Sequence, residues 1–176
     1  MIKKMRSIPH SMKAKLSAWN NGKGIDLESW ISCSGSCHLA VGYAEYFWPE
    51  FELVDDYIVR AGVSSSVIRE WERNNSSGDR RAVEATMNHM HLIDINYHDH
   101  DNRSEDILLR LGSVLSQIYE AKLKWQFPDR PCTVSLYVPE DREVLDAYEI
   151  TFWQKAHEHP DKQAEQDSAH QSTTAP

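Results

Sequence analysis

Residues 104–153 decide the fold: SEDILLRLGSVLSQIYEAKLKWQFPDRPCTVSLYVPEDREVLDAYEITFW. The first half predicts one long amphipathic helix, because its apolar residues recur at steps of three and four, the period of one helix face. These residues are Ile107, Leu111, Val114, Ile118, Ala121 and Trp125. Ser104 stands where a side chain can accept hydrogen bonds from the free amides of the first turn. Pro128 and Pro131 cannot continue a helix, so the chain must leave it there.

After Pro131 the apolar period changes to two, which is typical of strands with one buried face. The alternating residues are Cys132, Val134, Leu136 and Val138, followed after a polar connector by Tyr148, Ile150 and Phe152. We expect two antiparallel strands. An isolated two-stranded ribbon is marginally stable in water, so the preceding helix is expected to pack against its apolar face.

Upstream, the pattern predicts a helix on each side of residue 36 and then a hairpin. Asp26 is a good N-cap for a helix whose Trp30 and Ile31 face inward. A second helix runs from His38 to Trp48, because the residue before a proline disfavours helical backbone. Residues 51–59 flank an Asp-Asp pair, which suits a short hairpin or a bent strand.

Two more helices are predicted between this hairpin and the long helix. The first is capped by Ser64 or Ser65. The second is capped by Asp79 and repeats apolar residues at helical intervals. Those residues are Val83, Met87, Met90 and Ile93.

Together these elements predict an α+β fold in a single domain over residues 25–156. It has a roughly four-stranded antiparallel sheet with helices packed on one face, and a C-terminal hairpin preceded by the long amphipathic helix. Residues 1–24 lack periodicity and are interpreted as a mobile basic N-terminal arm, and residues 157–176 as a disordered C-terminal tail.

The net charge of −8 is unevenly distributed. The first 24 residues contain six basic residues and no acidic one, so the remainder carries −14. An acidic body makes nucleic-acid binding unlikely, because phosphate contacts need a basic face, and favours a basic protein partner. The chain has no apolar run long enough to span a membrane and no secretory-type apolar segment near its start, so a cytoplasmic location is expected.

Residues 43–51 are dense in aromatic side chains, which has two interpretations. They can anchor the core where a helix turns into a strand. Alternatively, they form an exposed aromatic patch with an acidic rim, as in protein-binding hot spots. The candidate partner-binding residues are Tyr46, Trp48, Glu50, Glu52, Asp55 and Asp56.

A histidine-rich segment offers the alternative of a metal site for zinc or another divalent ion. Its candidate ligands are His89, His91, Asp94, His98 and His100. Helical residues two apart point roughly 200° away from each other, so His89 and His91 cannot share an ion unless the helix ends between them. His98 and His100 could do so in an extended loop.

Three cysteines do not make a disulfide framework. Cys33 and Cys37 are expected to be reduced thiols buried on a helix. Since no set of residues forms a convincing catalytic pattern, the preferred hypothesis is a non-enzymatic protein without a cofactor. It would dock on a basic protein partner, as immunity proteins or regulatory adaptors do. The alternative is a metal-dependent hydrolase that uses the histidine-rich segment.

Overall fold

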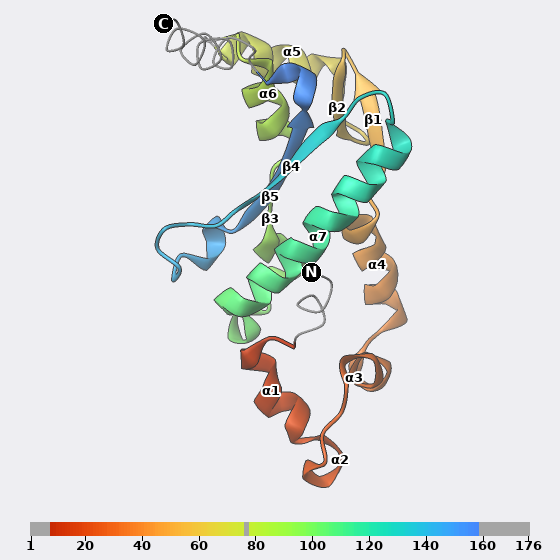
Figure 1. The fold of residues 1–176 in the computed structure, drawn as a ribbon, viewed down its shortest axis with the longest axis vertical. Helices are drawn as coiled ribbons and strands as arrows, with labels where there is room; N and C mark the ends of the chain where they lie inside the picture. Colours follow the sequence, from red (N-terminus) through yellow and green to blue (C-terminus); the bar gives the residue numbers. More distant parts are fainter. Residues whose placement is uncertain (1–7, 76–77, 159–176) are drawn as a thin grey trace, which may run out of the picture.

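The computed structural model describes residues 8–75 and 78–158, which fold into mixed helices and strands (Figure 1). The elements in chain order are α1 (His10–Ser17), α2 (Trp19–Gly22), α3 (Leu27–Ser34), α4 (Cys37–Phe47), β1 (Phe51–Val54), β2 (Tyr57–Arg60), α5 (Ser65–Asn74), α6 (Arg80–Met87), β3 (Met90–His91), α7 (Glu105–Gln126), β4 (Cys132–Tyr137) and β5 (Glu149–Gln154). Short 3₁₀ helices cover Leu92–Asn96, His100–Asn102, Leu145–Ala147 and Lys155–His157.

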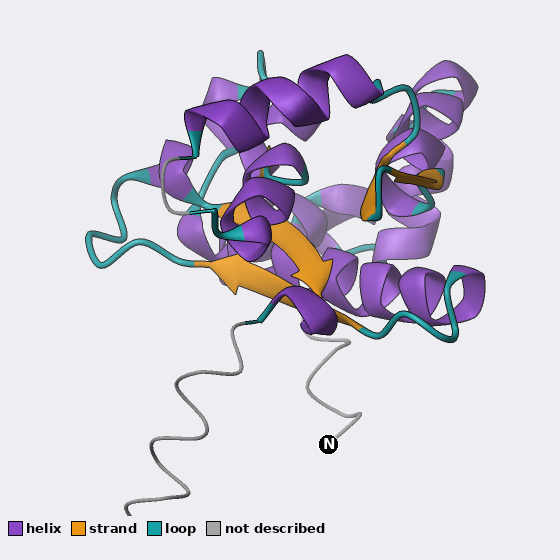
Figure 2. Ribbon diagram, turned by 90° about the horizontal axis from the view of Figure 1, so that it is seen from above, coloured by secondary structure: helices purple, strands orange, loops and turns teal. Residues whose placement is uncertain are grey.

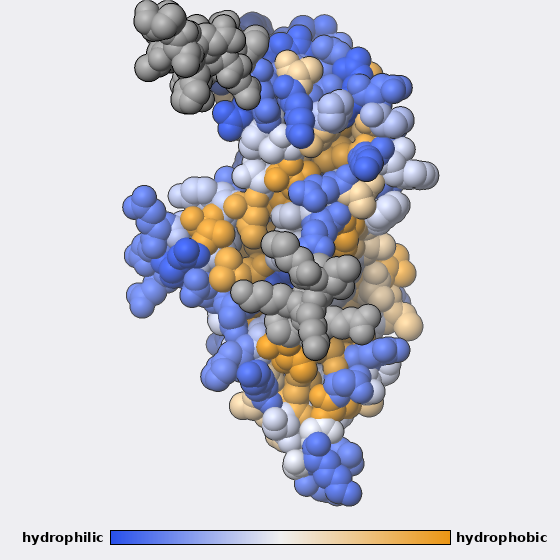
Figure 3. Space-filling model, viewed as in Figure 1, coloured by the Kyte–Doolittle hydropathy of each residue, from blue (hydrophilic) through white to orange (hydrophobic). Residues whose placement is uncertain are grey.

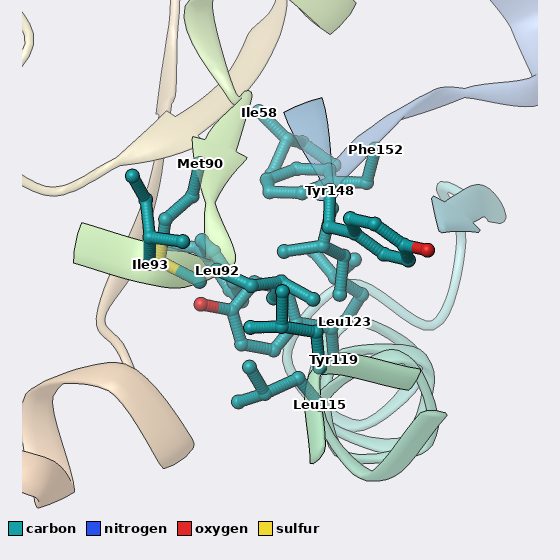
Figure 4. Close-up of a cluster of buried hydrophobic side chains, with 12 residues drawn as sticks. Ile58, Met90, Leu92, Ile93, Leu115, Tyr119, Leu123, Tyr148 and Phe152 are labelled. Carbon is teal, nitrogen blue, oxygen red and sulfur yellow. The ribbon is translucent and has the colours of Figure 1, made fainter. Parts of the chain in front are cut away.

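The predicted long helix and final hairpin are confirmed. Strands β4 and β5 are antiparallel, with Cys132 opposite Gln154 and Tyr137 opposite Glu149. One face of α7 packs on this hairpin and forms the main core (Figure 4). The helix approaches β4 closely at Gly112, where an added Cβ would lie 2.5 Å from Cδ1 of Leu136.

Helix α1 is attached to the first turn of α7. The backbone N–H and the hydroxyl of Ser11 donate to the Asp106 carboxylate at 2.9 and 2.8 Å. The Ser104 hydroxyl also donates to Asp106, at 2.6 Å, and makes no side-chain cap of its own. Residues His10–Ser17 of the predicted mobile arm are helical, Asn20 and Asn21 within α2 have left-handed backbone, and residues 1–7 lie outside the described part of the chain.

The predicted four-stranded sheet is wrong. In the described residues β1 pairs with β2 in one sheet, and a second sheet has the order β3-β5-β4. Figure 2 shows the two sheets as separate groups of strands. Strand β3 was not expected, because Met90 continues the helical spacing of Val83 and Met87. The helix nevertheless ends at Met87, and Met90 instead pairs with Ile150 of β5.

Helices cover both faces of the larger sheet, and not one face as predicted. Along β5, Phe152 lies against Tyr119 of α7, with ring centroids 6.4 Å apart. Its neighbours Thr151 and Trp153 instead contact α6: Thr151 donates to a backbone carbonyl at 2.5 Å, and Arg81 lies 4.4 Å from the Trp153 ring. Because strand side chains alternate between faces, α6 and α7 lie on opposite sides.

Glu84 of α6 and Asn88, the residue that follows this helix, connect the separate sheets. Glu84 accepts hydrogen bonds from the backbone N–H groups of Ile58 in β2 and Gln154 in β5, at 2.8 and 2.7 Å. Asn88, one turn later, donates to the carbonyls of Ile58 and Phe152 at 2.8 and 3.3 Å. These two side chains thus take the place of a backbone ladder between β2 and β5.

The C-terminal boundary also differs from the prediction. His157, assigned to the disordered tail, ends a 3₁₀ helix and is buried against Glu84. Glu158 is also ordered by hydrogen bonds from the side chains of Thr133 and Trp153, and residues 159–176 lie outside the described residues.

Candidate interaction surface

Trp48 and Trp125 form an exposed pair of indoles, which we call the indole pair. Trp48 follows the last residue of α4, and Trp125 lies in the last turn of α7. Their ring centroids are 6.2 Å apart, and 50% and 69% of the two residues is exposed. The ammonium of Lys122 lies 4.8 Å from each ring centroid. The indole pair is therefore an apolar surface that already holds one cation.

The local sequence explains why the indole pair stands on a rigid base. Pro49 prevents α4 from continuing past Trp48, and its ring is buried. Phe51 then enters the core, edge-on to Tyr119 and Phe152. The Gln126 side chain donates to the Phe51 carbonyl at 2.5 Å, which ties the end of α7 to β1.

The other predicted partner-binding residues lie at the end of α4 and along the β1–β2 hairpin. Tyr46 is half-buried against the main core. Glu50 and Glu52 are exposed on either side of Phe51. Asp55 and Asp56 form the two-residue turn of the β1–β2 hairpin, with φ of 47° and 68°, as such turns require.

Asp56 is engaged in ion pairs within the protein. Its carboxylate lies 2.6 Å from Arg130 and 3.3 Å from Arg80. The hydrogen bond from Arg130, opposed in part by desolvation, lowers the pKa of Asp56 below its usual range. Of the acidic candidates, Glu50 and Glu52 are the two next to the indole pair in the chain.

Trp125 was missed as a surface residue by the sequence reasoning. Its spacing places it on the apolar stripe of the long helix, which predicts burial. The main core, however, includes Leu123 and Phe127 on either side of Trp125 but not Trp125 itself. The only signal in the sequence was that Lys124 and Gln126 flank it, which does not decide exposure.

The histidine-rich segment is not assembled into a metal site. In residues 8–75 and 78–158, no three His, Cys, Asp or Glu side chains are placed to hold one ion. His89 and His91 do come together, with ring centroids 5.5 Å apart, because α6 ends before them. His98 and His100 each pack edge-on against Tyr97, and Asp94 is exposed.

The cysteine prediction is wrong in part. Cys33 in α3 and Cys37 at the start of α4 are free but exposed, not buried. Cys132 in β4 is the more shielded thiol, and its burial raises the pKa to about 12. A thiol with so high a pKa is inert at neutral pH.

Comparison of the chain with protein-family models, characterised proteins and solved structures found no match. Among the described helices, none has the length and apolar character needed to cross a bilayer.

Proposed function

We propose that this chain is a binding protein that docks on a basic segment of a partner protein through the indole pair. The observation that carries the proposal is the exposure of two adjacent tryptophans on a rigid base. Tryptophan is enriched at binding hot spots, where a few aromatic anchors provide most of the affinity. No second function is favoured by the contacts of the described residues.

The net negative charge of the body supports a cationic partner, whereas Lys122 and Lys124 place positive charge beside the indole pair itself. Indole faces attract ammonium and guanidinium groups, and Lys122 illustrates this attraction within the chain itself. The exposed carboxylates of Glu50 and Glu52 add negative charge nearby. The body from residue 49 to 158 has 21 acidic against 12 basic residues, which would accelerate the approach of a basic partner.

The test is selection of binders from a random peptide display library with the full chain as bait. We expect enriched peptides to carry a net positive charge and at least one aromatic or arginine side chain. One such peptide, labelled with a fluorophore, is then titrated against Trp48→Ala and Trp125→Ala. Loss of a hot-spot tryptophan typically costs about 2 kcal/mol or more, which is a weakening of roughly thirtyfold.

Trp71→Ala is the matched control, because Trp71 is 44% exposed but lies on α5. Its affinity for the peptide should equal that of the wild type. Selection of acidic or neutral peptides would contradict the basic partner. Equal weakening by Trp71→Ala, or none by Trp48→Ala and Trp125→Ala, would contradict the role of the indole pair.

A further inference from the structure

Helix α4 carries apolar side chains on more than one side and has no fully buried residue, and its Tyr46 and Phe47 pack, partly buried, against the main core. Its sequence, CHLAVGYAEYF, contains a single acidic residue, Glu45, and no lysine or arginine. Leu39 and Val41 are 55% and 72% exposed. Residues two apart in a helix point in nearly opposite directions, so both sides of α4 present apolar groups. Helices that are apolar all round are normally buried.

The preceding helix extends this surface. Helix α3 also has no buried residue, and Ile31 is 60% exposed. Figure 3 shows apolar surface over α4 and again between α1 and α3, at the end of the molecule remote from α5 and α6. We call residues 8–48, which form α1–α4, the helical arm.

The charges of the helical arm are complementary to themselves. Residues 8–24 carry Lys13, Lys15 and Lys23 and no acidic residue, whereas residues 25–48 carry Asp26, Glu28 and Glu45 and no lysine or arginine. A twofold contact brings the same patch of two copies together, so the basic half of one arm can face the acidic half of the other.

An open hollow in the helical arm is lined by apolar side chains and by side chains of both charges. Its volume is about 650 Å³, and its lining includes Ile8 and Ile25 together with Lys23 and Asp26. A strongly basic partner would suit the acidic body but not this neutral, apolar part of the chain. A second copy supplies both the apolar side chains and the opposite charges.

We infer that a second copy of this chain covers the helical arm, in a twofold dimer that buries α3 and α4. The basic α1–α2 half of each copy lies opposite the acidic α3–α4 half of the other. This inference does not depend on the proposed function, because the exposed apolar residues that it uses, Ile31, Leu39 and Val41, include neither tryptophan of the indole pair.

The first experiment is sedimentation equilibrium of the full chain. The wild type should have the mass of two chains, and Leu39→Glu combined with Val41→Glu should have the mass of one. The control is Val144→Glu, which places the same charge on a 46% exposed valine outside the arm and should remain dimeric. Circular dichroism checks that each variant is folded.

The second experiment tests the pairing of charges. Lys13→Glu with Lys23→Glu makes both halves of the arm acidic. Glu28→Lys with Glu45→Lys makes both halves basic. Each double variant alone should dimerise at least tenfold more weakly than the wild type. An equimolar mixture of the two should form heterodimers, detected by native mass spectrometry.

A wild-type chain that stays monomeric would overturn the inference. So would a mixture that forms no heterodimer, since the twofold pairing requires it. If the monomeric chain instead sediments with phosphatidylcholine vesicles, and the Leu39 and Val41 variant does not, a lipid surface covers α4 and the second copy is excluded.

Discussion

Glu84 accepts a hydrogen bond from Nδ1 of His157 at 2.7 Å, and both side chains are buried. The same carboxylate accepts three further hydrogen bonds, from the N–H of Ile58 and from the backbone and side-chain amides of Gln154. These hydrogen bonds to one carboxylate join β2, β5 and the final 3₁₀ helix. A buried charge is tolerated in this way only when it is fully paired.

Replacing Glu84 with Gln should destabilise the protein strongly. The new NH₂ group would face donors instead of acceptors, which leaves buried polar groups without partners. Breaking a buried, paired charge costs about 3–5 kcal/mol. Urea unfolding measures the loss, with Glu70→Gln on the exposed surface of α5 as the control. Equal stability of the two variants would show that the bridge contributes nothing.

Gly112→Val should also destabilise the protein. An added Cβ would lie 2.5 Å from Cδ1 of Leu136 and 2.9 Å from Cδ1 of Leu92, so both leucine side chains must leave their present positions in the core. Overpacking of this kind costs about 1–3 kcal/mol. The control is Gly42→Val, because a Cβ at Gly42 meets no atom within 4 Å. Thermal unfolding of the two variants distinguishes crowding from a general effect of glycine replacement.

Asp106→Asn should make the protein less sensitive to acid. Hydrogen bonds from Ser104 and Ser11 lower the pKa of Asp106 well below its usual range. A carboxyl group with a lowered folded pKa stabilises the protein above its unfolded pKa of about 3.9, and that contribution disappears as the pH falls further. The difference in free energy of unfolding between wild type and variant should therefore be present at pH 7 and shrink below about pH 4.

Asp129→Asn, in the exposed turn after α7, is the control for that pH series. Chemical denaturation at several pH values between neutral and strongly acidic gives the required free energies. If the free energy of unfolding of the wild type exceeded that of Asp106→Asn by the same amount at every pH, the proposed role of the Asp106 hydrogen bonds would be refuted.

The three cysteines should react with iodoacetamide at different rates. The thiolate is the reactive form, and burial, with a smaller effect of the Glu84 charge, raises the pKa of Cys132 to about 12. Cys33 and Cys37 are exposed in a single chain, so in the monomeric variant with Leu39→Glu and Val41→Glu they should be modified at least about tenfold faster at pH 8. Peptide mapping by mass spectrometry follows each site. In urea the three rates should become similar, and equal rates in the native protein would contradict the burial of Cys132.

Local pattern was sufficient for the elements whose signals lie within one stretch of chain. The apolar period of residues 107–125 predicts α7, and the proline pair at 128 and 131 predicts where it ends. Asp26 and Asp79 were predicted as N-caps, and each accepts a hydrogen bond from the third residue after it. These features were predictable because capping and periodicity depend on neighbours a few residues away.

The split sheet and the surface of the arm were not predictable in the same way. Met90 fits a helical period, but pairing with Ile150 places it in β3. The side chains of Glu84 and Asn88 join the two sheets by binding backbone groups that lie 26 to 70 residues away. Cys33, Cys37 and Trp125 were assigned to the interior by their apolar character, although what packs against them decides exposure.

The sequence by itself determined helices α3–α7, the final hairpin and the acidic balance of this protein, because hydrophobic period, caps and charge are properties of short segments. Only the tertiary structure decided that helices cover both faces of the sheet, that Trp48 meets Trp125, and that α3 and α4 remain uncovered. Those features depend on which surfaces meet after distant segments pack together. The free energy of that packing is shared among residues that no local pattern connects.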